Sequence, residues 1–232
     1  AERTAEILLE SEMVSCRLVP QGSNYTFLAL LEARDGSRCN TIYKPRIGEA
    51  PLWDFPDGTL YQREYAAYLL SEALGWNFVP VTVIRQGTHG IGSVQLFVEH
   101  VEEESYFSIL DSGKHTLELQ RICLFDWITN NADRKASHCL LGKDGRIWGI
   151  DHGLTFNSLP ALRTVIWDFL GYPIPESLIA EVQLVLTSLE THKELTGALE
   201  NTLESNEILV LQERMKQLIN AKSFPLPSDS RR

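Results

Sequence analysis

Two aspartates flank a short hairpin pattern in the second half of this 232-residue chain. Apolar residues at 139–141 and 147–150 surround an Asp-Gly turn signal, which is typical of two antiparallel strands. Because a two-stranded ribbon brings its ends together, we expect Asp133, just before it, and Asp151, just after it, to face one site. Two converging carboxylates can bind a hard divalent cation, and one of them can act as a base.

Each of these residues also has an ordinary structural explanation. Asp133 could pair with Arg134 or cap a turn, and Asp151 could cap the segment that follows it. His138 lies between the aspartates. Its imidazole is either a borderline metal ligand, which suits manganese or zinc better than magnesium, or a side chain that only hydrogen-bonds the loop.

A lysine, a glutamate and a small polar turn lie in the first half of the chain. Lys44 ends an expected strand at residues 39–44, and Glu64 lies on an expected helix at residues 60–74. A lysine at a strand end is usually just solvated, but in kinase folds a strand lysine reaches nucleotide phosphates and is held by a helix glutamate. Ahead of the first expected strand, Gly22-Ser23-Asn24 could donate hydrogen bonds to a phosphate, or be only a loop.

The secondary-structure elements expected around these residues differ between the two halves of the chain. The first hundred residues look β-rich, with strands expected at 25–32, 39–44, 79–85 and 93–100 around the helix at 60–74. Thr59 and Gln62 predict a capping box at the start of that helix, and Gly75 predicts its end. From residue 101 the pattern is helical, with a helix at 117–129 and two or three more between residues 175 and 221.

The formal net charge of −10 narrows the classes of partner. The chain has no run of basic residues, so it lacks the positively charged segment that would bind nucleic acid or an anionic membrane surface. No apolar stretch approaches the ~18 residues of a membrane-spanning helix, so we expect no membrane insertion and a cytoplasmic location. The four cysteines lack C-x-x-C spacing, which suggests neither a structural zinc site nor a disulfide framework.

The candidate residues occur in the order that kinases use: Lys44, Glu64, residues 92–99, residues 130–134 and residues 150–156. Together they resemble the phosphatidylinositol 3-/4-kinase-like family, above all the type II phosphatidylinositol 4-kinases and more distantly the HipA-type kinases. The resemblance extends over residues 14–157. The stretch 43–59 is also similar to a group of bacterial kinase-like proteins.

The resemblance implies an α+β, two-lobed kinase-like fold that binds ATP with Mg²⁺ or Mn²⁺. The β-rich N-terminal lobe would comprise residues 1–100 and the small helical C-terminal lobe residues 101–232. By position, Asp133 and Lys44 would be catalytic, and Asp151 with His138 would hold the metal. The implied nucleotide-binding residues are Gly22, Ser23, Asn24, Lys44, Glu64 and, at the hinge against the adenine, Gln95, Leu96, Phe97 and Val98.

The pattern departs from the kinase families at two positions. His138 stands where many kinases have a metal-binding asparagine, and His152 where protein kinases usually have phenylalanine. The C-terminal third also lacks the basic and aromatic surface that a phosphoinositide kinase would use on a membrane. Residues 53–55, Trp-Asp-Phe, could wall the cleft or form a satellite core.

Three functions remain open. The first is an ATP-dependent phosphotransferase that acts on a protein or small-molecule hydroxyl. The second is a nucleotide-binding, pseudokinase-like module that transfers nothing, and the third is transfer of a nucleotidyl group. Lys44, Glu64, Asp133 and Asp151 favour an enzyme, whereas His138 and the short helical lobe favour the binding module.

Overall fold

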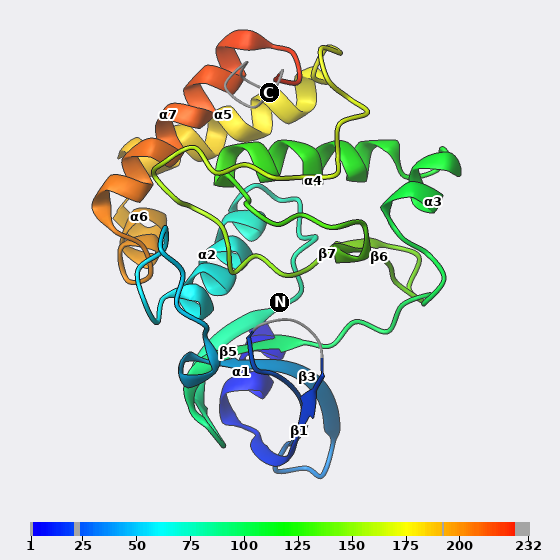
Figure 1. The fold of residues 1–232 in the computed structure, drawn as a ribbon, viewed down its shortest axis with the longest axis vertical. Coiled ribbons are helices and arrows are strands. Elements are labelled where there is room, and N and C mark those ends of the chain that lie inside the picture. The colour runs from blue at the N-terminus through cyan, green and yellow to red at the C-terminus, as the bar shows by residue number, and fades with distance from the viewer. Residues whose placement is uncertain (1, 21–23, 192, 226–232) are drawn as a thin grey trace.

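The protein has an antiparallel sheet at one end and a group of helices at the other (Figure 1). The computed structural model describes residues 2–20, 24–191 and 193–225. The sheet has the strand order β1-β2-β3-β5-β4, with all neighbours antiparallel. Its strands are β1 (Glu12–Val19), β2 (Thr26–Glu32), β3 (Arg38–Pro45), β4 (Thr82–Gly87) and β5 (Gly90–Leu96). The predicted α+β, two-lobed arrangement is therefore confirmed.

The two faces of the sheet have different partners. Tyr43 and Val94 are buried in a small core against α1 (Glu2–Glu10). Because successive side chains of a strand point to opposite faces, Lys44 and its β5 partner Ser93 face the other way, toward α2 (Leu60–Ala73). In Figure 1, α2 lies between the sheet and α4 (Thr116–Thr129), so the strand lysine is directed at the junction of the two lobes.

The N-terminus of α2 is capped differently from the prediction. Thr59 is not in an N-cap conformation, and its hydroxyl donates to the Pro56 carbonyl at 2.7 Å. The carboxylate of Glu49 instead accepts from the backbone N–H of Leu60 at 3.1 Å and of Tyr61 at 2.8 Å. The predicted capping box is therefore wrong, because the loop at 49–59 folds back and brings a distant carboxylate to the helix end. Gly75 does end the helix, with a φ of 69°.

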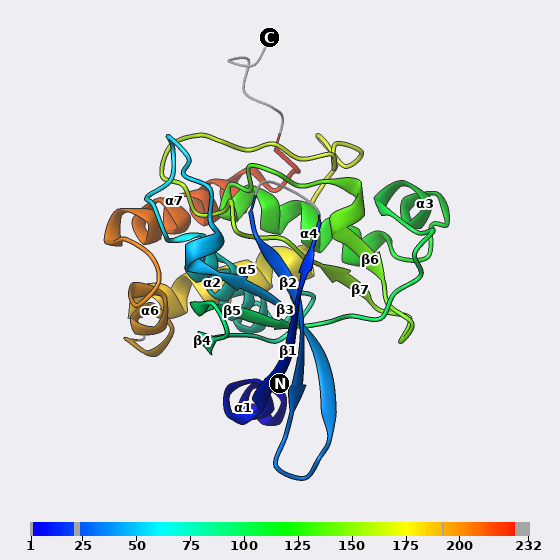
Figure 2. The ribbon, with the colours of Figure 1, turned by 60° about the horizontal axis from the view of Figure 1, so that its bottom comes forward.

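The helical lobe is built around α4 (Thr116–Thr129), whose side chains contribute many members of the larger core. Figure 2 shows α1 on the side of the sheet away from α4. The predicted second hairpin is confirmed as β6 (Cys139–Leu141) paired with β7 (Ile147–Gly149). The other elements are α3 (Tyr106–Asp111), α5 (Glu176–Thr191), α6 (Lys193–Glu200), α7 (Ser205–Ala221) and the 3-10 turns η1 (Arg46–Gly48) and η2 (Ala136–His138). No described helix is both long and apolar enough to cross a membrane.

Candidate functional site

Lys44 lies at the centre of a cluster of charges between the lobes. Its ammonium contacts the carboxylate of Glu64, as the sequence predicted, and lies 2.8 Å from Asp151 Oδ1. Burial opposes the charged form of Lys44, but the attraction of Asp151 and Glu64 outweighs burial and raises the pKa of the lysine. In return, Lys44 holds the pKa of Asp151 well below its usual range. The pair of Lys44 and Asp151 therefore stays charged at physiological pH.

The second oxygen of Asp151 faces His138. His138 Nε2 lies 3.3 Å from Asp151 Oδ2, because the Ile150 N–H donates to the His138 carbonyl at 3.0 Å and extends the β6–β7 hairpin. Asp151 itself adopts a left-handed φ of 63°, which turns the chain directly after the hairpin. Burial lowers the pKa of His138, so its imidazole is neutral and one of its two ring nitrogens can act as a ligand.

Asp133 lies on the loop that connects α4 to the hairpin, here called the 130–138 loop. The loop begins where Asn130 adopts a left-handed φ of 54° and reverses the chain. The Ala132 N–H donates to the Leu154 carbonyl at 2.9 Å, which ties the loop to the segment after Asp151. The Asp133 carboxylate is paired with Lys135 at 2.9 Å, rather than with Arg134. The hydrogen bond to Asp133 raises the pKa of Lys135, and the charge of Asp151 contributes a smaller part of the rise.

The donor atoms of Asp151 and His138 fit a divalent cation. A carboxylate oxygen and a neutral imidazole nitrogen 3.3 Å apart are suitable neighbouring ligands. Within residues 2–20, 24–191 and 193–225, no three His, Cys, Asp or Glu side chains form a metal-binding group. A cation at this pair would therefore need phosphate oxygens and water as its remaining ligands, which is how Mg²⁺ is usually held with nucleotides.

Of the other predicted nucleotide-binding residues, Asn24 and Gln95 form hydrogen bonds away from the Lys44 cluster. Gly22 and Ser23 lie outside the described residues, and Asn24 Oδ1 accepts from the Ala50 N–H at 2.7 Å. Gln95 is buried, and its amide donates to Thr82 Oγ1 at 2.9 Å.

The hinge residues Leu96 and Phe97 use their backbone N–H groups within the sheet. They donate to the Val81 carbonyl at 2.8 Å and to the Asn40 carbonyl at 3.0 Å. The Val98 carbonyl lies 2.9 Å from His100 Nδ1. Thus the structure brings Lys44, Glu64, Asp151 and His138 together, whereas the polar groups of Asn24 and Gln95 are engaged elsewhere.

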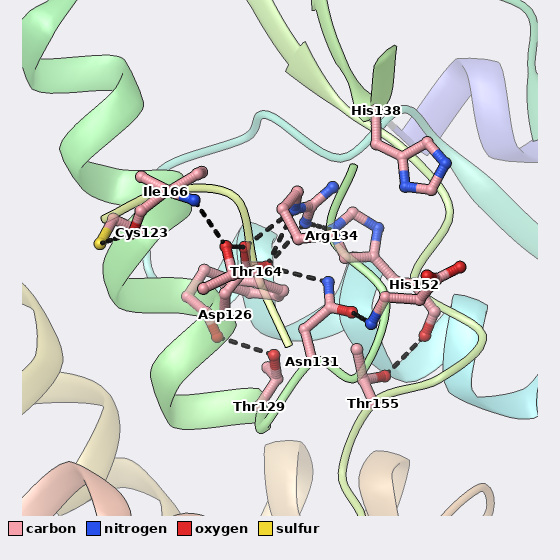
Figure 3. A network of polar contacts seen from close by, with 12 residues as sticks. Cys123, Asp126, Thr129, Asn131, Arg134, His138, His152, Thr155, Thr164 and Ile166 are labelled. Atoms are coloured by element: carbon pink, nitrogen blue, oxygen red, sulfur yellow. Dashed lines mark hydrogen bonds and ion pairs between the residues drawn. The ribbon is translucent and has the colours of Figure 1, made fainter. Parts of the chain in front are cut away.

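Sequence reasoning missed the buried polar residues behind this cluster, which Figure 3 shows from close by. Asp126 and Arg134 form a fully buried ion pair, with 2.8 Å between Asp126 Oδ1 and Arg134 Nη2. The same Nη2 lies 2.8 Å from His152 Nε2. One signal was available: Asp126 is a single charge in the apolar run Leu-Phe-Asp-Trp-Ile, and an acidic residue there must find a buried partner.

The loop at 49–59 packs beside the 130–138 loop. Phe55, Leu60 and Ala132 form a satellite core, as one of the two interpretations of residues 53–55 predicted. Trp53, by contrast, has 93% of its surface exposed. The Asn157 amide donates to the Asp54 carbonyl at 2.8 Å and fastens this loop to the segment after Asp151.

Solved structures with a similar fold include kinases. The structure of hydra Fam20 has a TM-score of 0.58 and 14% identity, and the match covers 95% of this chain and 87% of that one. The Helicobacter pylori proinflammatory kinase CtkA has a TM-score of 0.56 and 13% identity, with 94% of each chain covered. The Golgi casein kinase with Mn/ADP bound has a TM-score of 0.54 and 14% identity, covering 95% of this chain and 74% of that one. Such likeness shows a kinase-like fold.

Sequence comparison identifies the family. Protein Rv2133c of Mycobacterium tuberculosis is 35% identical over 259 aligned positions, which cover 97% of this chain and 92% of that protein. The sequence profile described as "Phosphatidylinositol 3- and 4-kinase" matches residues 59–207, more than half of the chain. The match contains the helix glutamate, the 130–138 loop and Asp151, so the chain belongs to the phosphatidylinositol 3- and 4-kinase family.

Proposed function

We propose that the protein is an ATP-dependent phosphotransferase that transfers the γ-phosphoryl group to a hydroxyl of a protein or small molecule. The observation that carries this proposal is the Lys44 ammonium, held by Glu64 and lying 2.8 Å from Asp151 at the junction of the lobes. A permanently charged ammonium fixed between a sheet and a helix is suited to phosphates, because charge-assisted hydrogen bonds to phosphate are strong.

Each residue of the cluster then has a role. Lys44 binds the α- and β-phosphates, and Glu64 holds the lysine in place. Asp133 orients the attacking hydroxyl. The Asp133 side chain is 37% exposed and its partner Lys135 is 59% exposed, so an acceptor can approach the Asp133 carboxylate from solvent. Asp151 and His138 would hold Mg²⁺ or Mn²⁺, which when bound would offset the negative charge of the phosphates. Positioning and charge neutralisation account for most of this chemistry.

The acceptor is proposed to be a protein or a small molecule rather than a lipid. The net charge of −10 repels anionic headgroups, and no basic and aromatic surface of the kind that binds membranes stands out in the sequence. The family name alone does not decide the acceptor, because one fold hosts several substrates.

A binding module without transfer activity is the second candidate. Asp133 is paired with Lys135 at 2.9 Å, so its carboxylate is partly neutralised before any acceptor arrives. His138 also stands where a metal-binding asparagine is common. Both observations are compatible with a protein that binds nucleotide and responds to it without chemistry.

One experiment separates these functions. The protein is incubated with magnesium or manganese, lysate from its source, and ATP labelled at the α- or at the γ-position. Transfer of γ-label supports the phosphotransferase, transfer of α-label supports nucleotidyl transfer, and binding without transfer supports the module. Asp133→Asn should abolish the γ-transfer, whereas Asp111→Asn, an exposed aspartate at the end of α3, should leave it intact. Equal transfer by both variants would contradict the role of Asp133.

A further inference from the structure

The guanidinium of Arg134 connects the two halves of the proposed site. The residue directly follows Asp133, and its side chain is fully buried. Its Nη1 donates to the Ile150 carbonyl at 2.9 Å, and its Nη2 lies 2.8 Å from His152 Nε2. Ile150 and His152 are the two neighbours of Asp151. A single planar side chain therefore holds both flanks of Asp151 while its own backbone continues from Asp133.

Asp126 anchors this guanidinium from α4. Its two oxygens accept from Arg134 Nε at 3.1 and 2.9 Å, in addition to the contact with Nη2. Asp126 Oδ1 also accepts from the amide of Asn131 at 2.9 Å, and Asn131 Oδ1 in turn accepts from the Asp133 N–H at 3.0 Å. Asp126 thus holds the side chains of Asn131 and Arg134, which lie on either side of Asp133 in the chain (Figure 3).

His152 completes the connection to the Lys44 cluster. A guanidinium can only donate hydrogen bonds, so His152 Nε2 must be the acceptor and Nδ1 must carry the hydrogen. Burial and the neighbouring Arg134 lower the pKa of His152, in agreement with a neutral ring. Within the described part of the chain, Nδ1 has no hydrogen-bond partner. The backbone N–H of His152 donates to Glu64 Oε2 at 3.0 Å, so the Glu64 carboxylate contacts both Lys44 and this residue.

We propose that Asp126, Asn131, Arg134 and His152, here called the buried relay, are positioning residues that fix Asp133 relative to Asp151 and Glu64. None of the four needs to touch substrate, because each acts through the backbone or side chain of a residue that would. The inference rests on the proposed function, because that function gives the positioned residues their roles: Asp133 orients the acceptor, Asp151 binds the metal and Glu64 holds Lys44.

A purely structural role is the competing explanation, and energetics separate the two. Replacing a buried ion pair by apolar side chains of similar volume is often neutral or stabilising, because the charges no longer have to be desolvated. A relay that only filled the core could therefore be replaced without loss of function. A positioning relay could not, because a displacement of about 1 Å can lower turnover about 100-fold.

The first test is the double variant Asp126→Leu/Arg134→Met, which removes both charges. We expect its melting temperature to stay close to that of the wild type, its kcat to fall about 10- to 100-fold and its KM for ATP to change less than about threefold. Calorimetry with ADP, with and without Mn²⁺, gives a readout that needs no turnover. The gain in ADP affinity from manganese should fall about tenfold or more. The matched control is Glu190→Leu/Lys216→Met, which removes an exposed ion pair of 2.9 Å between α5 and α7.

The second test uses His152 and decides the question if the double variant does not fold. His152→Gln retains an acceptor for Arg134, whereas His152→Phe fills the apolar space beside Phe78 and Phe125 but leaves an Arg134 N–H unsatisfied. A positioning role predicts that the Gln variant keeps more of the manganese-dependent affinity and of kcat, even where the Phe variant is equally or more stable. A structural role predicts that function follows stability.

The outcomes distinguish failure of this inference from failure of the proposed function. A wild type that neither binds nucleotide nor transfers phosphate overturns the proposed function, and the inference with it. A wild type that does both, together with a double variant that keeps its melting temperature, kcat and manganese response, overturns the inference alone. The same holds if His152→Phe matches or exceeds His152→Gln in the manganese response.

Discussion

Lys44 is the residue on which the proposed nucleotide site most depends, and its replacement gives the first prediction. Lys44→Ala should weaken binding of ATP or ADP by about 1–3 kcal/mol, because a charge-assisted phosphate contact is lost. Isothermal titration calorimetry measures the change. Lys143→Ala is the matched control, since Lys143 pairs with Glu99 at 3.5 Å on an exposed surface. Unchanged affinity in Lys44→Ala would remove the central assignment.

His138 gives the second prediction at this scale. Its Nε2 lies 3.3 Å from Asp151 Oδ2, and imidazole favours softer divalent ions than an amide oxygen does. We expect the wild type to prefer manganese over magnesium, and His138→Asn to increase the use of magnesium. The measurement is a metal titration of ADP affinity and, where turnover is found, of its rate. Equal response to both metals before and after the substitution would contradict a ligand role for His138.

The sequence was sufficient to predict some of the site and not the rest. Periodicity predicted the strand of Lys44 and the helix of Glu64, and the resemblance to kinases added the expectation that the two side chains meet, as they do across β3 and α2. The hairpin led to the prediction that Asp133 and Asp151 face one site, which stays a prediction; the contact that the structure shows beside the hairpin is that of His138 with Asp151. The apolar run around Asp126 indicates a buried partner, but Arg134 could not be foreseen as that partner, because the pair depends on the left-handed turn at Asn130, which periodicity does not encode.

At the scale of an element, the close approach of β3 and β5 gives the third prediction. Gly92 pairs with Pro45, and a Cβ at Gly92 would lie 2.7 Å from Pro45 Cα and would also collide with the Lys44 carbonyl. Gly92→Ala should therefore destabilise the protein by about 1–3 kcal/mol and, by displacing β3 at Lys44, weaken nucleotide binding.

The control for this substitution is Gly197→Ala on α6. A Cβ at Gly197 meets no atom within 4 Å, and alanine is the better helix former by about 0.5–1 kcal/mol. Urea unfolding should then show opposite signs for the two variants, and calorimetry should show a binding defect in Gly92→Ala only. If Gly92→Ala is as stable as the wild type and binds nucleotide normally, β3 is not held at Lys44 by this contact.

Element boundaries show why part of the fold was missed. The helix at 60–74 and the hairpin at 25–44 matched α2, β2 and β3, because each has clear periodicity and a glycine at its turn or end. The strands expected at 79–85 and 93–100 are shifted to β4 and β5 around a tighter turn at Gly90. Neither α1 nor β1 was predicted: β1 is an edge strand with mostly exposed side chains, so its alternation is weak.

At the scale of the whole molecule, the two lobes have separate hydrophobic cores. The sheet encloses a small one with α1, formed by the buried residues Leu8, Ala29, Leu31, Tyr43, Val83 and Val94. The much larger core includes Ala66, Ala67 and Leu70 of α2 together with α4, α5 and α7. The helix that carries Glu64 therefore contributes to the core of the helical lobe while also packing on β4 and β5, whereas Lys44 belongs to the sheet.

This division predicts that the sheet opens without the helical lobe. Local opening requires less free energy where fewer apolar contacts are lost, so amides of β1 to β3 should exchange at least about tenfold faster than those of α4 in native-state hydrogen exchange. Each such opening separates Lys44 from Glu64. ADP with manganese should slow exchange in β3, because a ligand that contacts both lobes stabilises the closed arrangement by mass action. The same protection throughout the sheet and α4, unaffected by nucleotide, would show instead that the lobes unfold as one unit and that ligand does not bridge them.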